Sequence, residues 1–156
     1  MSSKVWPSKL VLEYNVASGD DDPRDRRRTT FDQLYPSNHG KYGVSDHVGW
    51  KNVDHLVGLL EVAPSSRLTI TGSVSSVCLR TVRDALYGSL GIALMVNREA
   101  PSRVVGRQID LWGSYSVSKY VTIGGGLGVT VKGDYFGAAG KGDRVVYPYL
   151  QWTVSR

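Results

Sequence analysis

The chain has 156 residues, a net charge of +5 and a single cysteine, Cys78. This length suits one domain, and one cysteine excludes both an internal disulfide and a metal site built on cysteines. No run of about 18 apolar residues is present, which excludes a transmembrane helix. The first ten residues also lack the apolar segment of a signal peptide. This indicates either a cytosolic protein or a chain whose true N-terminus lies elsewhere.

Apolar and polar residues alternate along most of the chain. The alternation predicts six strands, at about 8–18, 53–63, 67–79, 107–118, 120–132 and 145–155. In the fifth of these, Val121 and Ile123 lie on one side, and Thr122 and Thr130 lie on the other. A period of two is typical of a sheet with one apolar and one polar face.

The only segment with helical spacing is 81–96, and Gly88 and Gly91 interrupt it. Glycine disfavours the interior of a helix. We therefore expect this segment to be a loop with at most one helical turn, and we predict an all-β protein.

The predicted connections alternate between long and short. Long or medium connections fall at 19–52, 80–106 and 133–144, whereas tight ones fall at 64–66 and near Lys119. All the elaborate loops therefore lie at one end of an antiparallel up-and-down meander. Outer-membrane β-barrels have this asymmetry. A soluble antiparallel sandwich shows the same alternation, so the alternation alone leaves both folds open, and the loop asymmetry favours the membrane.

The long loop 29–52 carries an ordered series of aromatic, polar and glycine residues. The series is Phe31, Asp32, Gln33, Leu34, Tyr35, Pro36, Asn38, His39, Tyr42, Gly43, Asp46, Gly49, Trp50 and Asn52. It resembles a motif of the alginate export family of bacterial outer-membrane β-barrels. The stretches 13–25, 83–91 and 105–128 are similar to that family as well, so the resemblance covers nearly the whole chain.

The resemblance implies that residues 1–156 form a single domain, the C-terminal portion of a larger barrel in the bacterial outer membrane. It implies a passive channel for an anionic polysaccharide or a related solute, with no enzymatic activity and no cofactor. The expected partners are outer-membrane lipid and either the remaining strands or a second copy to close the sheet edges, without nucleic acid. Family members tend to end on an aromatic residue, whereas this chain ends at Arg156. A soluble carbohydrate-binding β-sandwich module and a non-functional barrel fragment are the alternatives.

The candidate pore residues fall into two groups. We expect basic residues of the loops to gather an anionic solute at the mouth: Arg26, Arg27, Arg28, Arg80, Arg83, Arg98, Arg103 and Arg107. We expect polar and aromatic residues of the strands to line the lumen: Glu13, Asn15, Thr69, Thr71, Ser73, Asp110, Trp112, Ser114, Thr122, Thr130, Tyr149, Gln151 and Thr153. Hydroxyls and amides can bind sugar hydroxyls, and aromatic rings can stack on sugar rings.

The motif loop itself is aromatic without a strand period, so we predict a compact cap over the long-loop end. In this cap Phe31, Tyr35, Tyr42 and Trp50 form a cluster. Asp32 and Asp46 are expected to accept hydrogen bonds that hold its turns, and His39 is expected to pack within the loop.

Other chemistry is less well supported. His39, His47 and His55 are eight residues apart, which fits no compact zinc motif. The acidic turn of Asp20, Asp21, Asp22 and Asp25 could hold Ca²⁺, or it is a solvated turn beside its basic neighbours. Ser45, Asp46 and His47 are adjacent, so their side chains point apart on an extended chain and cannot form a triad. We therefore predict neither a metal site nor a catalytic site.

Overall fold

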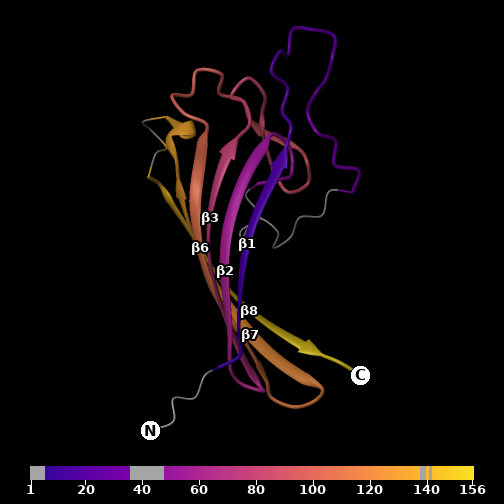
Figure 1. Cartoon of the computed structure of the whole chain (residues 1–156), viewed down its shortest axis with the longest axis vertical. Coiled ribbons are helices and arrows are strands. Elements are labelled where there is room, and N and C mark those ends of the chain that lie inside the picture. Colours follow the sequence, from indigo (N-terminus) through magenta and orange to yellow (C-terminus); the bar gives the residue numbers. More distant parts are fainter. Residues whose placement is uncertain (1–5, 36–47, 138–139, 141) are drawn as a thin grey trace.

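A computed structural model describes residues 6–35, 48–137, 140 and 142–156. Six long strands form one antiparallel sheet, in the order β1-β2-β3-β6-β7-β8 (Figure 1). They are β1 (Ser8–Ala17), β2 (Val53–Ser65), β3 (Leu68–Leu79), β6 (Val104–Ser116), β7 (Val121–Lys132) and β8 (Arg144–Val154). Every strand pairs with its neighbour in the chain order of the long strands, so the predicted all-β meander is confirmed.

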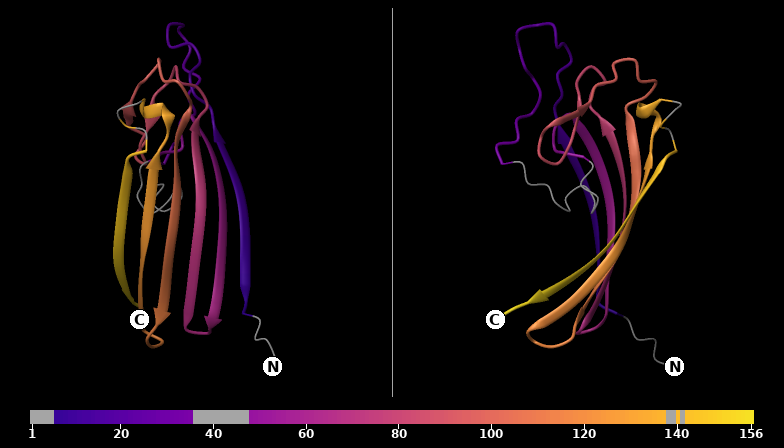
Figure 2. Two further views of the ribbon diagram at one scale, coloured as in Figure 1. Left: turned by 90° about the vertical axis from the view of Figure 1, so that its left-hand side faces the viewer. Right: turned by 180° about the vertical axis from the view of Figure 1, so that it is seen from behind.

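The short turns and the long loops lie at opposite ends of this sheet, as predicted. The turns that join β2 to β3 and β6 to β7 lie at one end, together with the start of β1 and the end of β8 (Figures 1 and 2). The three long connections lie together at the other end. None of the helical segments in the described part of the chain is long and apolar enough to cross a bilayer.

The second long connection differs from the expectation. Instead of a helical turn it contains a small hairpin, formed by β4 (Leu86–Tyr87) and β5 (Ala93–Met95). Gly91 supplies the positive φ of 73° in the hairpin turn, and Gly88 N–H bonds to the Ile92 carbonyl at 2.9 Å. The two glycines that interrupt the helical spacing are therefore turn residues. A 3₁₀ turn, η1 (Asp134–Phe136), lies in the third connection.

The pairing register sorts the side chains onto two faces. Val74, Ile109, Val129 and Val146 lie in one row across β3, β6, β7 and β8, on the face that turns away from the loops. Exposed apolar residues fill this outer face: Leu10, Leu12, Leu60, Val74, Ile109, Leu111, Leu127, Leu150 and Trp152. Leu12 is 76% exposed and Leu150 is 86% exposed. Such residues are not a sandwich core, because no second sheet covers them in the part of the chain that the structure describes.

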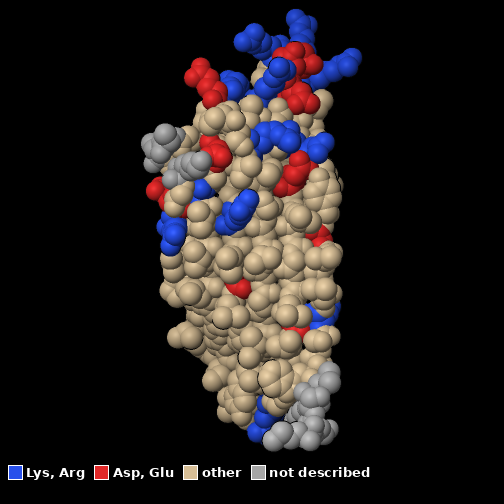
Figure 3. Space-filling model, turned by 60° about the vertical axis from the view of Figure 1, so that its left-hand side comes forward, with Lys and Arg blue, Asp and Glu red and all other residues tan. Residues whose placement is uncertain are grey.

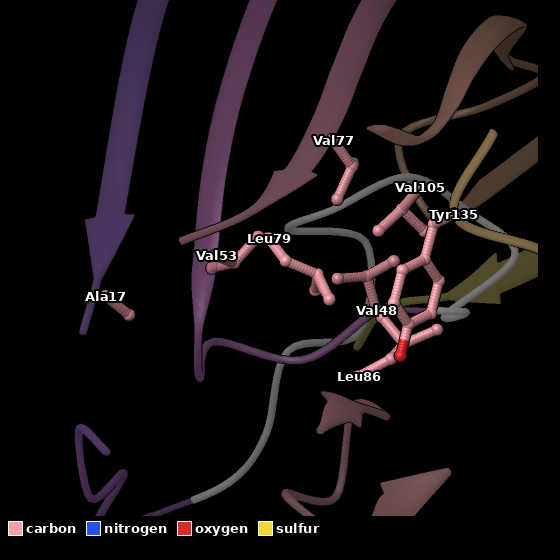
Figure 4. Close-up of a cluster of buried hydrophobic side chains, with 8 residues drawn as sticks. All are labelled: Ala17, Val48, Val53, Val77, Leu79, Leu86, Val105 and Tyr135. Atoms are coloured by element: carbon pink, nitrogen blue, oxygen red, sulfur yellow. The ribbon is translucent and has the colours of Figure 1, made fainter. Parts of the chain in front are cut away.

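Buried apolar residues gather instead at the loop end of the inner face (Figure 4). Val53, Val77 and Leu79 come from the strand ends, and Leu86 and Tyr135 come from the loops. A β-bulge contributes Val105: Val77 pairs with Gly106 and Cys78 pairs with Val104, so Val105 is the extra residue. A bulge redirects a side chain, and Val105 is buried in this cluster. This buried cluster thus packs the loops against the inner face of the sheet.

Candidate functional site

The inner face of the sheet carries the polar residues expected to line a lumen. Register pairs Thr69 with Ser114, Thr71 with Trp112 and Ser73 with Asp110 across β3 and β6. The rows continue through the glycines of β7 to Tyr149 and Gln151 on β8. The remaining members of this face are Glu13, Asn15, Thr122, Thr130 and Thr153. The structure brings these residues onto one surface, and their contact with a solute stays a prediction.

Glycines on β7 make room for the large side chains of this face. A Cβ atom on Gly126 would lie 2.6 Å from Trp112 Cβ and 2.8 Å from Tyr149 Cε1. Gly124 lies beneath Gln151 in the same way, with a distance of 3.2 Å to its Nε2. Trp112 and Tyr149 therefore flank the bare backbone of β7. Aromatic rings on either side of a bare strand are suited to stacking on flat surfaces such as sugar rings.

Asp110 is the most buried carboxylate of this face. It is 4% exposed, and it accepts hydrogen bonds from Gln108 Nε2 at 2.8 Å and from Ser73 Oγ at 3.3 Å. Charge on the strand part of the inner face is close to balanced. Two cations, Lys9 and Lys132, stand against three carboxylates, Glu13, Glu61 and Asp110. The strands therefore provide a polar surface whose charges nearly balance, without a cluster of cations.

Asn52, the last residue of the family-like motif, connects three segments at the loop end. It is fully buried and has a positive φ of 52°. Its Nδ2 donates to the carbonyls of Thr81 and Ala85 at 2.9 Å each, and its Oδ1 accepts the Thr81 N–H at 3.0 Å. Its main chain bonds to Ser18 and Arg80. Asn52 therefore joins the end of β1, the start of β2 and the second long loop.

Asp84 makes the second connection between these loops. Its carboxylate accepts hydrogen bonds from Thr30 Oγ1 at 2.6 Å, Ala85 N–H at 2.7 Å, Asp20 N–H at 2.9 Å and Tyr87 OH at 2.9 Å. Burial by itself raises the pKa of a carboxyl, but the four donors outweigh it and hold the pKa of Asp84 below its ordinary value. Burial raises the pKa of the Tyr87 hydroxyl, and its hydrogen bond to the Asp84 carboxylate raises that pKa further. Asp84 is therefore an anion around which the first and second loops fold.

Tyr135 attaches the third loop. Its ring is fully buried, and its hydroxyl accepts the Asn97 N–H at 3.1 Å and donates to the Met95 carbonyl at 3.3 Å. Asn97 Nδ2 returns a bond to the Tyr135 carbonyl at 2.9 Å. Burial raises the pKa of Tyr135. The three long connections thus form one hydrogen-bonded unit, which we call the loop cap.

The motif loop enters this cap only in part. Phe31 and Trp50 are in contact, with ring centroids 5.6 Å apart, and Gly49 N–H bonds to the Tyr87 carbonyl at 2.8 Å. Tyr35 does not join the cluster, because its side chain is 88% exposed. Asp32 forms an exposed ion pair with Lys51 at 3.2 Å in place of the expected turn contacts. The expectations for Pro36, His39, Tyr42 and Asp46 lie outside the described residues.

The candidate arginines separate into two places. Arg26, Arg27 and Arg28 are exposed on the first loop. Arg83 Nη1 bonds to the Asp21 carbonyl at 2.9 Å, and Arg98 Nε bonds to the Arg83 carbonyl at 3.2 Å. All five lie in the long connections, and their part in gathering a solute stays a prediction.

Arg80, Arg103 and Arg107 lie toward the outer face at the loop end of the sheet. Arg80 and Arg103 both pair with Asp54, whose side chain also accepts a hydrogen bond from Tyr14 on the outer face. Arg107 lies opposite Ser76 within β6, on the same outer face. Arg107 was expected among the loop residues, but it lies inside β6, which begins at Val104, and it has the same outward parity as Ile109.

The acidic turn needs no cation to hold its shape. Asp20, Asp22 and Asp25 each accept a backbone N–H two residues further along, at 3.2, 3.1 and 2.7 Å. These contacts are typical of Asx turns. Over the ranges that the structure describes, there is no group of three or more His, Cys, Asp or Glu residues placed to hold a metal ion.

An exposed apolar outer face, a polar inner face, tight turns at one end and long loops at the other together define the wall of an outer-membrane β-barrel. The chain belongs to the alginate export family, whose model, described as Alginate export, matches residues 2–146. This membership places it among outer-membrane β-barrels that transport polysaccharide. No curated protein and no solved structure matches the chain significantly.

Proposed function

We propose that this chain forms part of the wall and mouth of a passive outer-membrane channel for an anionic polysaccharide. The separation of the two faces carries this proposal. Apolar residues such as Leu12 and Leu111 are exposed on the outer face, whereas Thr71, Gln108 and Asp110 are buried on the inner face. Lipid can cover the apolar outer face, and the polar inner face suits a channel for a hydrated solute.

Attraction of an anionic solute is assigned to the loops in this proposal. The strand part of the inner face has nearly balanced charge, whereas Arg26, Arg27 and Arg28 are exposed on the first loop. Lysine, arginine and acidic side chains gather at the loop end of the molecule (Figure 3). Charges at a mouth raise the local concentration of an oppositely charged solute and its rate of entry. A nearly neutral wall then allows the polymer to slide without being held.

The proposal includes further strands. Within the described residues, β1 and β8 each pair with one neighbour, so each leaves one edge open. Open edges are not stable in hydrocarbon, and an unpaired edge also invites association with other strands. We propose that residues 1–156 are the C-terminal portion of a larger barrel, and that other strands or a second copy pair with these edges.

The decisive experiment is planar-bilayer conductance. It compares this chain with a version extended at its N-terminus by the preceding strands of a longer family member, with and without an anionic oligosaccharide. We expect stable, oligosaccharide-blockable conductance from the extended version and little from the short chain. Stable blockable conductance from the short chain alone would refute the need for further strands. Equal block by anionic and neutral oligosaccharides would refute the preference for an anionic solute.

A further inference from the structure

Arginines line the upper boundary of the apolar outer face. Register defines a row across the sheet at this level: Tyr14, Leu56, Ser76, Arg107, Val131 and Arg144. The next row toward the short turns contains only apolar residues and glycine: Leu12, Gly58, Val74, Ile109, Val129 and Val146. The change from arginine to aliphatic side chains is therefore complete within one row.

The position of this row matches the edge of a membrane. On β6, Arg107 and the aromatic Tyr115 both face outward. The two residues are eight positions apart, which is roughly 26 Å along the strand and about 20 Å along the bilayer normal at a strand tilt of about 40°. The apolar band of an outer-membrane barrel is about 25 Å tall and is bounded by aromatic girdles. When the band lies in hydrocarbon with the loops outside the cell, Arg107 lies in the headgroup layer of the outer leaflet.

The charge at this boundary is strongly positive. Asp54 accepts contacts from Arg80 Nη1 at 3.0 Å and from Arg103 Nη1 at 3.7 Å, and the two arginine side chains are 47% and 54% exposed. Among the described residues no ion pair is recorded for Arg107 or Arg144, and both are exposed. Arg80 and Arg103 therefore share one carboxylate, and with Arg107 and Arg144 beside them the four arginines and Asp54 carry a net charge of +3 at the edge of an apolar surface.

Arginine at such a boundary fits phosphate. The guanidinium fork binds phosphate oxygens with two parallel hydrogen bonds, and it is more weakly hydrated than an ammonium group. Arg107 and Arg144 lie two strands apart, about 10 Å, so two phosphates carried by one headgroup can reach one each. The aliphatic residues directly below, Ile109 and Val146, face the acyl chains of the same lipid.

We propose that Arg107 and Arg144, with Arg80 and Arg103 beside them, bind the phosphate groups of an acylated glycolipid of the outer leaflet. Asp54 and Tyr14 act as positioning residues in this site. Tyr14 OH donates to Asp54 Oδ1 at 2.8 Å, and Asp54 in turn holds Arg80. The inference rests on the membrane orientation in the proposed function and is independent of the solute that the channel carries.

The test uses the full chain folded in zwitterionic detergent micelles. Its probes are a bisphosphorylated, multiply acylated disaccharide lipid and the same lipid after enzymatic removal of both phosphates. Native mass spectrometry counts the bound lipid across a titration. We expect the phosphorylated lipid to bind at least about tenfold more tightly than the dephosphorylated one, which corresponds to one charge-assisted contact of about 1.4 kcal/mol.

Matched variants locate the contact. The double variant Arg107→Gln/Arg144→Gln is expected to bind both lipids equally, whereas Arg26→Gln/Arg27→Gln, which removes the same charge from the mouth, retains the preference. Arg107→Lys/Arg144→Lys keeps the charge and loses the fork, so an intermediate preference is expected. Circular dichroism of each variant reports whether the sheet is intact, and the lysine variant decides the outcome if the glutamine variant does not fold.

Two results overturn the proposal. Equal binding of both lipids by the unaltered chain shows that apolar contact alone attracts the lipid. An equal loss in the mouth variant shows that net charge, and not this row, is responsible. These failures differ from failure of the membrane placement itself, in which the chain stays in solution without detergent.

Discussion

Asn52 and Thr81 exchange two hydrogen bonds at the loop end of the sheet. The Asn52 Nδ2 donates to the Thr81 carbonyl at 2.9 Å, and the Thr81 N–H donates to the Asn52 Oδ1 at 3.0 Å. The Asn52 side chain therefore takes the place of a neighbouring strand for the backbone of Thr81, two residues beyond the end of β3. Because Asn52 is fully buried, water cannot take over these bonds when the side chain is removed.

Replacing Asn52 is expected to destabilise the fold strongly. Asn52→Ala leaves two carbonyls and one N–H buried without partners, at a cost of about 3 kcal/mol or more in the free energy of unfolding. Asn52→Gly accepts the positive φ of 52° without strain, so it isolates the loss of the hydrogen bonds and should retain most of that cost. Urea unfolding of the chain in micelles measures both. Near-complete recovery in the glycine variant would show that backbone strain dominates.

Gly49 is expected to tolerate no side chain. A Cβ atom there would lie 2.0 Å from the Gly88 carbonyl oxygen, which belongs to the backbone and cannot turn aside. Gly49→Ala must therefore separate the motif loop from the β4–β5 hairpin, and we expect a loss of about 1–3 kcal/mol. Gly58→Ala is the control, because its Cβ would meet only side-chain atoms at ordinary distances, Leu12 Cδ2 at 3.6 Å and Val74 Cγ2 at 3.9 Å. Equal urea midpoints for the two variants would contradict this account.

The loop cap is expected to weaken in acid through Asp84. Folding lowers the pKa of this carboxyl below its ordinary value of 3.8. The folded state thus binds the proton more weakly than the unfolded chain does. The resulting stability is complete above that ordinary value and is lost as the pH falls through the lower, folded value. Unfolding midpoints measured from about pH 5 to about pH 2 should show this loss of stability. In Asp84→Asn the part of the pH dependence that comes from this carboxyl should be absent.

Asp32→Asn serves as the control for this titration. The Asp32 carboxylate is 80% exposed, and among the described residues it pairs with Lys51. Ion pairs that water reaches contribute little to stability. The variant should follow the acid dependence of the unaltered chain. If it removes as much of that dependence as Asp84→Asn does, the cap does not depend on Asp84 in particular.

The strands could be predicted from the sequence because a period of two is a local property. β1 and β7 end within about one residue of the expected limits, and the two faces follow from parity alone. The start of β6 was predicted three residues too late, because the bulge at Val105 interrupts the alternation there. Arg107 was assigned to the mouth although the predicted strand 107–118 already contained it, and its parity with Ile109 places it on the outer face. A bulge is set by the packing around it, which the sequence does not display.

The loop cap could not be predicted in the same way. The importance of Asn52 and Asp84 for the loop cap lies in hydrogen bonds to residues 29 to 64 positions away. Asn52 and Asp84 both lie in stretches similar to the family, so their importance had a signal, whereas Tyr135 lies outside those stretches. Tyr35 shows the opposite error, because its place in an aromatic motif suggested burial and its side chain is exposed.

A charged side chain is expected to lower stability more on the outer face than on the inner face. Leu59 and Leu60 are neighbours on β2 that register places on opposite faces, and Leu60 is 51% exposed on the outer one. Leu60→Lys near the middle of the apolar band should cost about 2–4 kcal/mol of stability in a bilayer, whereas Leu59→Lys should cost clearly less. Folding into lipid vesicles, followed by urea titration, measures both. If the chain folds in buffer without lipid and the variants match, the soluble carbohydrate-binding alternative is favoured.

The arginines of the first loop are expected to set the response to an anionic solute. In the extended, conducting version, Arg26→Gln/Arg27→Gln/Arg28→Gln should weaken block by an anionic oligosaccharide and leave block by a neutral one unchanged, because steering acts on charge alone. The difference should shrink as salt rises, since the screening length falls from about 10 Å at 0.1 M to about 3 Å at 1 M. Arg107→Gln, which lies on the outer face, is the matched control and should leave the block unchanged. An equal effect of this outer-face variant would show that the mouth is not where the solute is attracted.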